Sequence, residues 1–282
     1  MAANIRFGIS SHLYHDRQLT QEHLAEIASH GFDIVELFAT RSHFDYHDPA
    51  AIASLRRWLG AAGVSLHGIH APIAESAAGG RFTGAYSVAA KDNAARQAAV
   101  REVDAALAIA REIECEVLVL HLGLTASQPG AGENSRAAAT KSVEEIIRLT
   151  EPLKTRVMVE VIPNDLSSAA TLVAMLERDF EGSGAGICMD FGHAHMMGDV
   201  PDAIETAAEH LLTTHVHDNR GRDDEHLVPY KGTIDWAAAL VTMRKIGYDG
   251  TYLMELANTG SSSTVLEEAR RARQKMERAL AD

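Results

Sequence analysis

The chain has 282 residues, two cysteines and a formal net charge of −13. Two cysteines cannot form a disulfide framework, and the negative charge argues against broad binding to a nucleic-acid backbone. The first residues lack the pattern of a signal peptide, and the sequence contains no apolar run long enough to cross a membrane. We therefore expect a cytoplasmic protein without a membrane association.

Short apolar or β-branched runs alternate with longer amphipathic runs along the whole chain. The predicted strands are residues 6–9, 33–38, 65–70, 117–121, 156–161, 186–190, 213–217 and 251–255. The predicted helices are residues 20–30, 49–62, 92–113, 142–152, 166–178, 201–210, 235–246 and 265–281. This alternation predicts an α/β fold with a parallel sheet, and its size is typical of a single (β/α)8 TIM barrel over residues 1–282. An open doubly wound sheet usually shows a glycine-rich phosphate loop, which the sequence lacks.

Two connections between the predicted elements are long and rich in small residues. They follow the third and fourth predicted strands and cover residues 71–90 and 123–136. Connections of this length in a compact domain are often lids over an active site, so we predict that role for both.

Ionisable residues occupy the carboxyl ends of most predicted strands or the loops that follow them: His70, His121, Glu160, Asp190, His193, His215, His217, Asp224, His226 and Glu255. These ends meet at one face of a barrel, where active sites lie. Several carboxylates buried together need cations to compensate them. Carboxylate oxygens and imidazole nitrogens suit Mn²⁺, Zn²⁺, Co²⁺, Fe²⁺ or Mg²⁺. The sequence thus predicts a divalent metal site at the C-terminal face of the strands.

These segments, in this order, resemble the xylose-isomerase-like barrel superfamily, which contains the sugar (phosphate) isomerases and epimerases and endonuclease IV. The matching segments are Val35-Glu36-Leu37, His70-Ala71-Pro72, Leu120-His121-Leu122-Gly123, Val159-Glu160-Val161, Met189-Asp190-Phe191-Gly192-His193, His215-Val216-His217-Asp218-Asn219, Asp224-Glu225-His226-Leu227, Gly232-Thr233-Ile234-Asp235-Trp236 and Glu255. They cover nearly the whole chain and are much more specific for the superfamily than for the reaction.

The resemblance to the epimerase branch implies one divalent ion, with Mn²⁺ favoured, on four residues: Glu160, Asp190, His215 and Glu255. An acid, Asp218, follows His215 by three residues, as in the family's His-x-x-Asp pattern, and this favours His215 over His217. The two histidines share one side of a strand, so the alternative stays open.

The resemblance to endonuclease IV implies up to three zinc ions, because all nine of its ligands have counterparts. The additional ligands would be His70, His121, His193, Asp224 and His226. The surroundings depart from that family, with His217-Asp218 after the seventh-strand histidine and Glu225 inside the Asp-x-His pair.

The charge at the site distinguishes the two reactions. One ion on three carboxylates leaves a net charge of about −1, so a carboxylate can still accept a proton. We therefore expect a sugar or sugar phosphate isomerase or epimerase in which Glu160 and Glu255 transfer a proton through a metal-stabilised enediolate. His193 would orient a hydroxyl. The further substrate contacts would be His70, His121, His217, His226, Glu36 and Lys231. Lys231 either meets a substrate phosphate or remains in solvent.

Three ions with four carboxylates give a net charge of about +2, which suits a phosphodiesterase acting on abasic DNA. Such an enzyme must grip a duplex, and few arginines or aromatic residues cluster for that task. A small carbohydrate is therefore the expected partner, and nucleic acid is disfavoured. A metal-dependent carbohydrate lyase or dehydratase is a further alternative, and a homo-oligomer is compatible with the resemblance.

Overall fold

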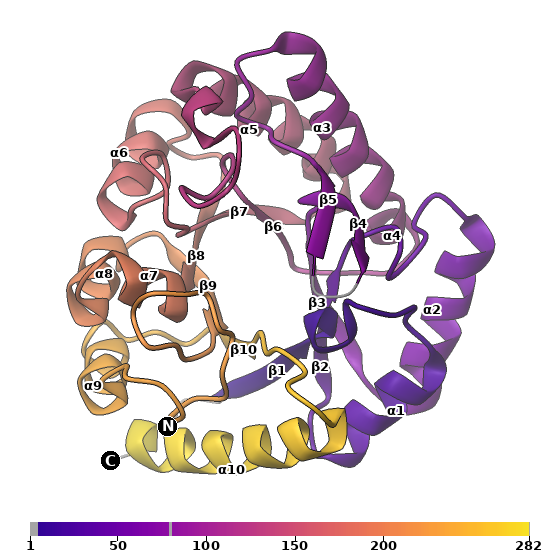
Figure 1. Ribbon diagram of the computed structural model, residues 1–282, viewed down its shortest axis with the longest axis vertical. Coiled ribbons are helices and arrows are strands. Elements are labelled where there is room, and N and C mark those ends of the chain that lie inside the picture. Colours follow the sequence, from indigo (N-terminus) through magenta and orange to yellow (C-terminus); the bar gives the residue numbers. More distant parts are fainter. Residues whose placement is uncertain (1–4, 79–80, 282) are drawn as a thin grey trace.

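Eight parallel strands close into a barrel in the computed structural model, which describes residues 5–78 and 81–281 (Figure 1). The barrel strands are β1 (Arg6–Ser10), β2 (Ile34–Phe38), β3 (Ser65–His70), β6 (Val117–Leu120), β7 (Arg156–Glu160), β8 (Gly186–Asp190), β9 (Leu211–Val216) and β10 (Thr251–Met254). β1 pairs with β2 on one side and with β10 on the other, which closes the sheet. The predicted (β/α)8 barrel is confirmed.

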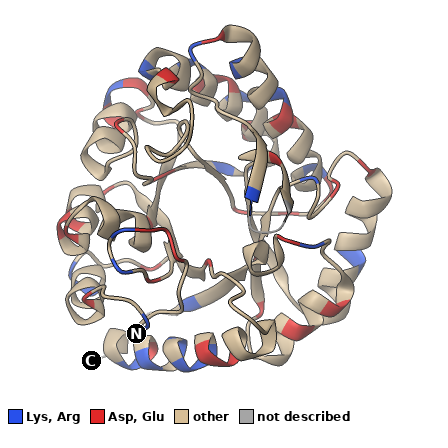
Figure 2. Ribbon diagram, viewed as in Figure 1, with Lys and Arg blue, Asp and Glu red and all other residues tan. Residues whose placement is uncertain are grey.

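The helices form a ring around the strands (Figure 1). They are α1 (Gln21–Ser29), α2 (Pro49–Ala62), α3 (Asn93–Ala106), α4 (Ala108–Glu112), α5 (Arg136–Thr150), α6 (Ala169–Asp179), α7 (Phe191–Met197), α8 (Val200–Ala207), α9 (Trp236–Lys245) and α10 (Ser262–Ala281). Three single-turn 3₁₀ segments add to them: Ser11–Tyr14, Ala131–Glu133 and Glu151–Leu153. Lys, Arg, Asp and Glu lie interleaved along the outer helices (Figure 2).

Side-chain alternation along each strand separates the barrel interior from the layer under the helices. Val117, Val119, Met158 and Cys188 form a small apolar cluster inside the barrel. Leu118 and Leu120, the other residues of β6, belong to the large core shared with the helices. Because side chains two residues apart in a strand lie on the same side, Glu160 follows Met158 and Asp190 follows Cys188 at the inner surface. The pattern therefore places both carboxylates inside the mouth, above an apolar floor.

Several predicted boundaries differ from the structure. The helix predicted at 92–113 is divided at Leu107, and the helix predicted at 142–152 begins already at Arg136. Ser135 caps that earlier start by accepting a hydrogen bond from the Ala138 amide (3.4 Å). The first long connection contains an unpredicted antiparallel hairpin, β4 (Ala74–Ala78) with β5 (Arg81–Ala85). Its Gly79-Gly80 pair lies outside the described residues. None of the helices described is long and apolar enough to traverse a bilayer.

Helix α7 also went unpredicted, and it begins directly at the end of β8. Asp190 is the last residue of β8 and the N-cap of α7, where its Oδ1 accepts a hydrogen bond from the His193 amide (2.6 Å). One carboxylate therefore ends a strand, starts a helix and faces the mouth of the barrel. His193 lies in the first turn of α7, which holds its ring beside that carboxylate.

Candidate metal centre

Four side chains from neighbouring strands converge at the mouth of the barrel: Glu160, Asp190, His215 and Glu255. One potential ligand atom from each lies within 4.8 Å of all the others. Nδ1 of His215 lies 3.3 Å from Oε1 of Glu160 and 3.5 Å from Oε2 of Glu255. All four residues are buried. We call these four residues the central cluster.

The central cluster fits a divalent cation. Glu160 Oε1, Glu160 Oε2, His215 Nδ1 and Glu255 Oε1 are buried and make no hydrogen bond of good geometry among the described residues, although imidazole nitrogens lie 3.0 Å and 3.3 Å from the two Glu160 oxygens. Leaving such groups unpaired in a protein interior is costly, whereas a cation at their centre would satisfy them together. Three carboxylates and one imidazole are also a donor set suited to Mn²⁺, Zn²⁺ or related ions. The unpaired atoms and the donor chemistry therefore both agree with a metal site.

The geometry distinguishes His215 from His217. His215 directs Nδ1 into the central cluster, whereas Nε2 of His217 lies 3.0 Å from an Asp190 oxygen and 3.7 Å from Oδ1 of Asp224. Asp218, three residues after His215, does not explain the preference for His215 as a ligand, because it makes no hydrogen bond to any residue of the central cluster. Its two oxygens instead bind the loop that follows β9.

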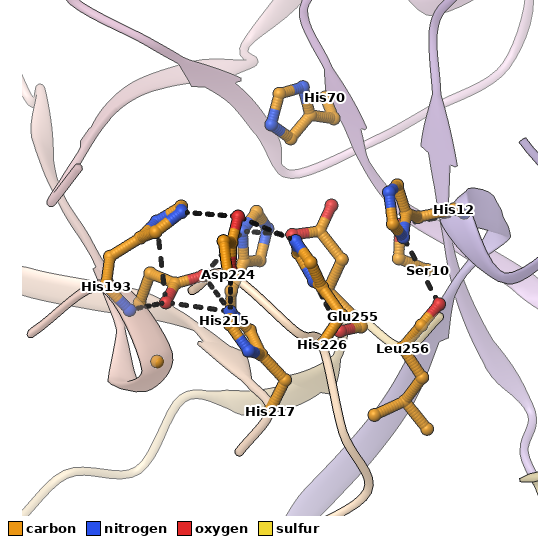
Figure 3. Close-up of polar contacts among 12 residues, drawn as sticks. Ser10, His12, His70, His193, His215, His217, Asp224, His226, Glu255 and Leu256 are labelled. Carbon is orange, nitrogen blue, oxygen red and sulfur yellow. Dashed lines mark hydrogen bonds and ion pairs between the residues drawn. The ribbon is translucent and has the colours of Figure 1, made fainter. Parts of the chain in front are cut away.

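A second group lies beside the central cluster and consists of His217, Asp224 and His226, whose ligand atoms also lie within 4.8 Å of one another. Figure 3 shows His193 and His226 directed toward Asp224, with Nε2 of each 3.1 Å from Oδ2. Nδ1 of His226 bonds the Glu255 carbonyl oxygen (3.0 Å), and its backbone adopts the left-handed conformation at φ 46°. We call His193, His217, Asp224 and His226 the side cluster.

His70 and His121 complete the set on the other side of Glu160. Their Nε2 atoms lie 3.3 Å and 3.0 Å from Oε2 of Glu160. His70, Glu160 and His215 also form a group with ligand atoms within 4.8 Å. All nine residues predicted to ligate one to three ions are therefore joined through short contacts, and Glu160 is shared.

The carboxylates and imidazoles stabilise each other's charged forms. Burial raises the pKa of Glu160, but His121 and His215 hold that pKa well below its usual range. Burial lowers the pKa of His215, but Cys188, Glu36 and Glu160 raise it well above its usual value. Burial likewise lowers the pKa of His226, and Asp224 and Glu255 raise it to about 9. Protons on the imidazoles thus compensate the carboxylates in the metal-free protein, where a cation would otherwise do so.

A cavity of about 300 Å³ opens above the clusters. The β4–β5 hairpin contributes Phe82 to its wall, and the second long connection contributes Leu124, Thr125 and Gln128. Both connections predicted as lids therefore line the cavity. Its volume lies at the lower end of the range for small-molecule sites. Of the described lining residues, Arg222 is the one Lys or Arg.

The predicted substrate contacts divide into two sets. His70, His121, His193 and His226 line the cavity. His217, also a member of the side cluster, is fully buried and does not line the cavity; its ring stacks on that of His226 with 4.1 Å between centroids.

The substrate contacts predicted for Glu36 and Lys231 remain predictions, because neither residue is among those that line the cavity. Glu36 is buried below the mouth and does not line the cavity, because it lies two residues before the end of β2. Lys231 lies outside the cavity and pairs with Glu268 (2.9 Å), which agrees with its solvent-exposed alternative.

His12 lines the cavity but was missed in the sequence. Its Nδ1 bonds the Leu256 carbonyl (3.2 Å), and its ring lies tilted beside that of His226, with 4.6 Å between centroids (Figure 3). The first predicted strand ended at Ile9, three residues before His12, so this histidine was not counted among the ionisable residues at strand ends. A strand ending at Ser10 would have revealed it.

Asp218 is an anchor that the sequence did not reveal. It accepts hydrogen bonds from the Tyr230 amide (2.9 Å), the Ile234 amide (3.2 Å) and Trp236 Nε1 (2.8 Å). The amide of Asn219 also donates to it (2.9 Å). Asp218 thereby closes the loop that carries Asp224 and His226.

Glycine is required at two places where backbone meets these groups. A Cβ at Gly192 would lie 2.0 Å from Cε1 of His217, and one at Gly232 would lie 2.2 Å from Oδ1 of Asp218. Gly192 therefore makes room for a side-cluster histidine, and Gly232 makes room for the anchor.

Comparison with known proteins agrees with this architecture. An uncharacterized protein of Methanocaldococcus jannaschii is 27% identical over 265 residues, covering 90% of this chain and 85% of that protein. The inosose isomerase of Bacillus licheniformis is 25% identical over 151 residues, covering 49% of this chain and 53% of that protein.

Solved structures show the same fold. A D-tagatose 3-epimerase-like protein superposes with a TM-score of 0.78 at 24% identity, covering 98% of this chain and 97% of that one. D-psicose 3-epimerase in the presence of D-fructose superposes with a TM-score of 0.77 at 21% identity, covering 99% and 100%. The family model described as xylose isomerase-like TIM barrel matches residues 24–280. The chain belongs to the xylose isomerase-like TIM barrel family.

Proposed function

We propose that the protein is a divalent-metal-dependent isomerase or epimerase of a sugar or a related polyol ketone. The observation that carries this proposal is the central cluster, in which Glu255 lines a small-molecule cavity and the fully buried Glu160 has a carboxylate oxygen within 4.8 Å of one of Glu255. The names of the similar proteins, which include sugar 3-epimerases and an inosose isomerase, support the same class of reaction.

Glu160, Asp190, His215 and Glu255 would hold the ion, and Mn²⁺ is our first choice. When bound, such an ion supplies Lewis-acid polarisation of a substrate carbonyl and its neighbouring hydroxyl. Three carboxylates exceed the charge of one divalent ion, so the protein retains a base at the site. The excess negative charge is what separates this proposal from a hydrolase.

The chain's own residues would move the proton. One of Glu160 and Glu255 accepts the proton from the carbon next to the carbonyl, and the electron pair of the broken C–H bond delocalises into the carbonyl as an enediolate. The other carboxylate returns a proton, to the opposite face for epimerisation or to the adjacent carbon for isomerisation. β8 and β9 separate the strands that carry the two carboxylates, so the two groups approach the substrate from different directions. His193 lines the cavity and would orient a hydroxyl.

Solvent exchange tests the proposal. The Mn²⁺-loaded protein, incubated in deuterated water with a panel of ketoses, aldoses and inososes, should place deuterium at the carbon next to the carbonyl. Glu255→Gln should reduce the rate by about 10²–10⁴, because an amide cannot accept that proton. Glu268→Gln removes a carboxylate at the Lys231 pair outside the cavity and should leave the rate unchanged. Absence of exchange and of product across the panel would contradict the proposal.

The side cluster and the His70–His121 pair favour a second candidate, a multinuclear phosphodiesterase, because both supply ligands for further ions. Among the described residues that line the cavity, Arg222 is the one Lys or Arg, and this scarcity of positive charge argues against binding to duplex DNA. Elemental analysis decides between the candidates. One ion per chain supports the isomerase, whereas three ions with metal-dependent nicking of an abasic duplex would replace it.

A further inference from the structure

Glu36 is a buried carboxylate that the proposed reaction does not use. It lies in register with Ser10, while Phe38 at the end of β2 lies in register with His70. Glu36 is therefore one inward-facing position below the mouth, beneath the central cluster. It is 1% exposed. An ionised group at such depth requires specific partners.

Two side chains contact the carboxylate of Glu36. Ser10 Oγ donates to Oε1 (3.2 Å), and Nε2 of His215 lies 3.2 Å from Oε2. The opposite ring nitrogen of His215, Nδ1, lies 3.3 Å from Glu160 and 3.5 Å from Glu255. The imidazole thus joins Glu36 on one side to the central cluster on the other.

This arrangement has a consequence for the proton on His215. A neutral imidazole carries one N–H, and the nitrogen without it is the one able to ligate a metal. A carboxylate accepts hydrogen bonds but does not donate them when ionised, so it selects the form of His215 with the proton on Nε2. Hydrogen bonding from a ligating imidazole to a carboxylate also makes the ligating nitrogen more basic.

We propose that Glu36 is a positioning residue that holds the proton of His215 on Nε2 and so keeps the Nδ1 lone pair directed at the central cluster. The proposal rests on the metal centre of the proposed function. It replaces the substrate contact predicted for Glu36 with a role exerted through His215. Ser10 orients the carboxylate through its other oxygen.

Metal affinity provides the first test. Glu36→Gln keeps an acceptor of similar shape but removes the charge, and Glu36→Met keeps the volume but removes the acceptor. Titration with Mn²⁺ should show binding weakened by about 10–100-fold, more for Met than for Gln. Glu102→Gln is the matched control, because Glu102 also bonds a histidine, His47 (2.9 Å), but belongs to α3 and does not line the cavity. Its affinity for Mn²⁺ should equal that of the wild type.

The second test reads the proton directly. Histidine side-chain ¹⁵N NMR of the wild type should show Nε2 of His215 protonated and protected from exchange, with and without Zn²⁺, since Nε2 carries the proton in the neutral and charged imidazole alike. In Glu36→Met that protection should be lost. Wild-type Mn²⁺ affinity in both variants, or Nδ1 protonated in the Zn²⁺-loaded wild type, would overturn the proposal. If the wild type binds no divalent ion, the proposed function fails, and an unprotonated Nε2 in the metal-free protein would separately refute the role of Glu36.

Discussion

Replacing Asp218 by asparagine tests whether one buried carboxylate holds the loop that carries Asp224 and His226. Four donors converge on Asp218, and the Tyr230 amide and Trp236 Nε1 share Oδ2. An asparagine amide group in place of Oδ2 would face those two donors with donors of its own. Each buried donor left unpaired costs about 1–3 kcal/mol, so we expect Asp218→Asn to lower the free energy of unfolding by about 2–6 kcal/mol.

A double-mutant cycle isolates this effect from other consequences of the substitution. Trp236→Phe removes one of the donors, so Asp218→Asn should be less costly in that background by about 1–3 kcal/mol. Urea unfolding followed by circular dichroism measures all four proteins. Additivity within about 0.5 kcal/mol would refute the idea that Trp236 depends on this carboxylate.

Three further predictions follow from packing, burial and charge. Gly192→Ala should displace His217 and lower turnover at least about tenfold. The control is Gly60→Ala in α2, where an added Cβ meets nothing within 4 Å; it should leave activity unchanged and raise the free energy of unfolding by up to about 1 kcal/mol. Burial lowers the pKa of His43 from 6.5 to about 4, so as the pH falls the imidazole is protonated in the unfolded chain before it is protonated in the folded protein. The free energy of unfolding should therefore fall by about 3 kcal/mol between pH 6.5 and pH 4. Urea titrations across this range should find a smaller decrease in His43→Gln. Removing bound metal with a chelator should lower the melting temperature near neutral pH by calorimetry, and no change after confirmed metal loss would exclude a structural contribution from the ion.

The barrel was predictable from the sequence because its signals are local and repeat eight times. An apolar run such as Val117–Leu120 indicates a strand, and the glycine after α2 indicates the end of a helix before the next strand. Neither signal requires knowledge of the elements that pack against it. The missed elements carry weaker signals. The β4–β5 hairpin consists largely of alanine, glycine and serine, and α7 has only seven residues and begins at a carboxylate that the strand pattern had already assigned.

The site was predictable in membership but not in arrangement. Strand ends and the segments that follow them identified the ten residues of the two clusters and the His70–His121 pair, because parallel strands present their ends at one face. Depth along the barrel axis depends on register between strands, so the sequence did not reveal that Glu36 lies below the mouth. The partners of Asp218 come from residues 12–18 positions later in an irregular loop, where no periodicity predicts a contact.

Asp190 serves both as the N-cap of α7 and as a member of the central cluster, and this gives the centre a preorganised ligand. The hydrogen bond from the His193 amide already fixes its rotamer, so arrival of a cation freezes no torsion there and costs less entropy than at an unrestrained carboxylate. The same bond links metal occupancy to local folding, since fraying of α7 would release Asp190 and move His193 together. Hydrogen exchange at the amides of α7 should therefore slow when the ion binds.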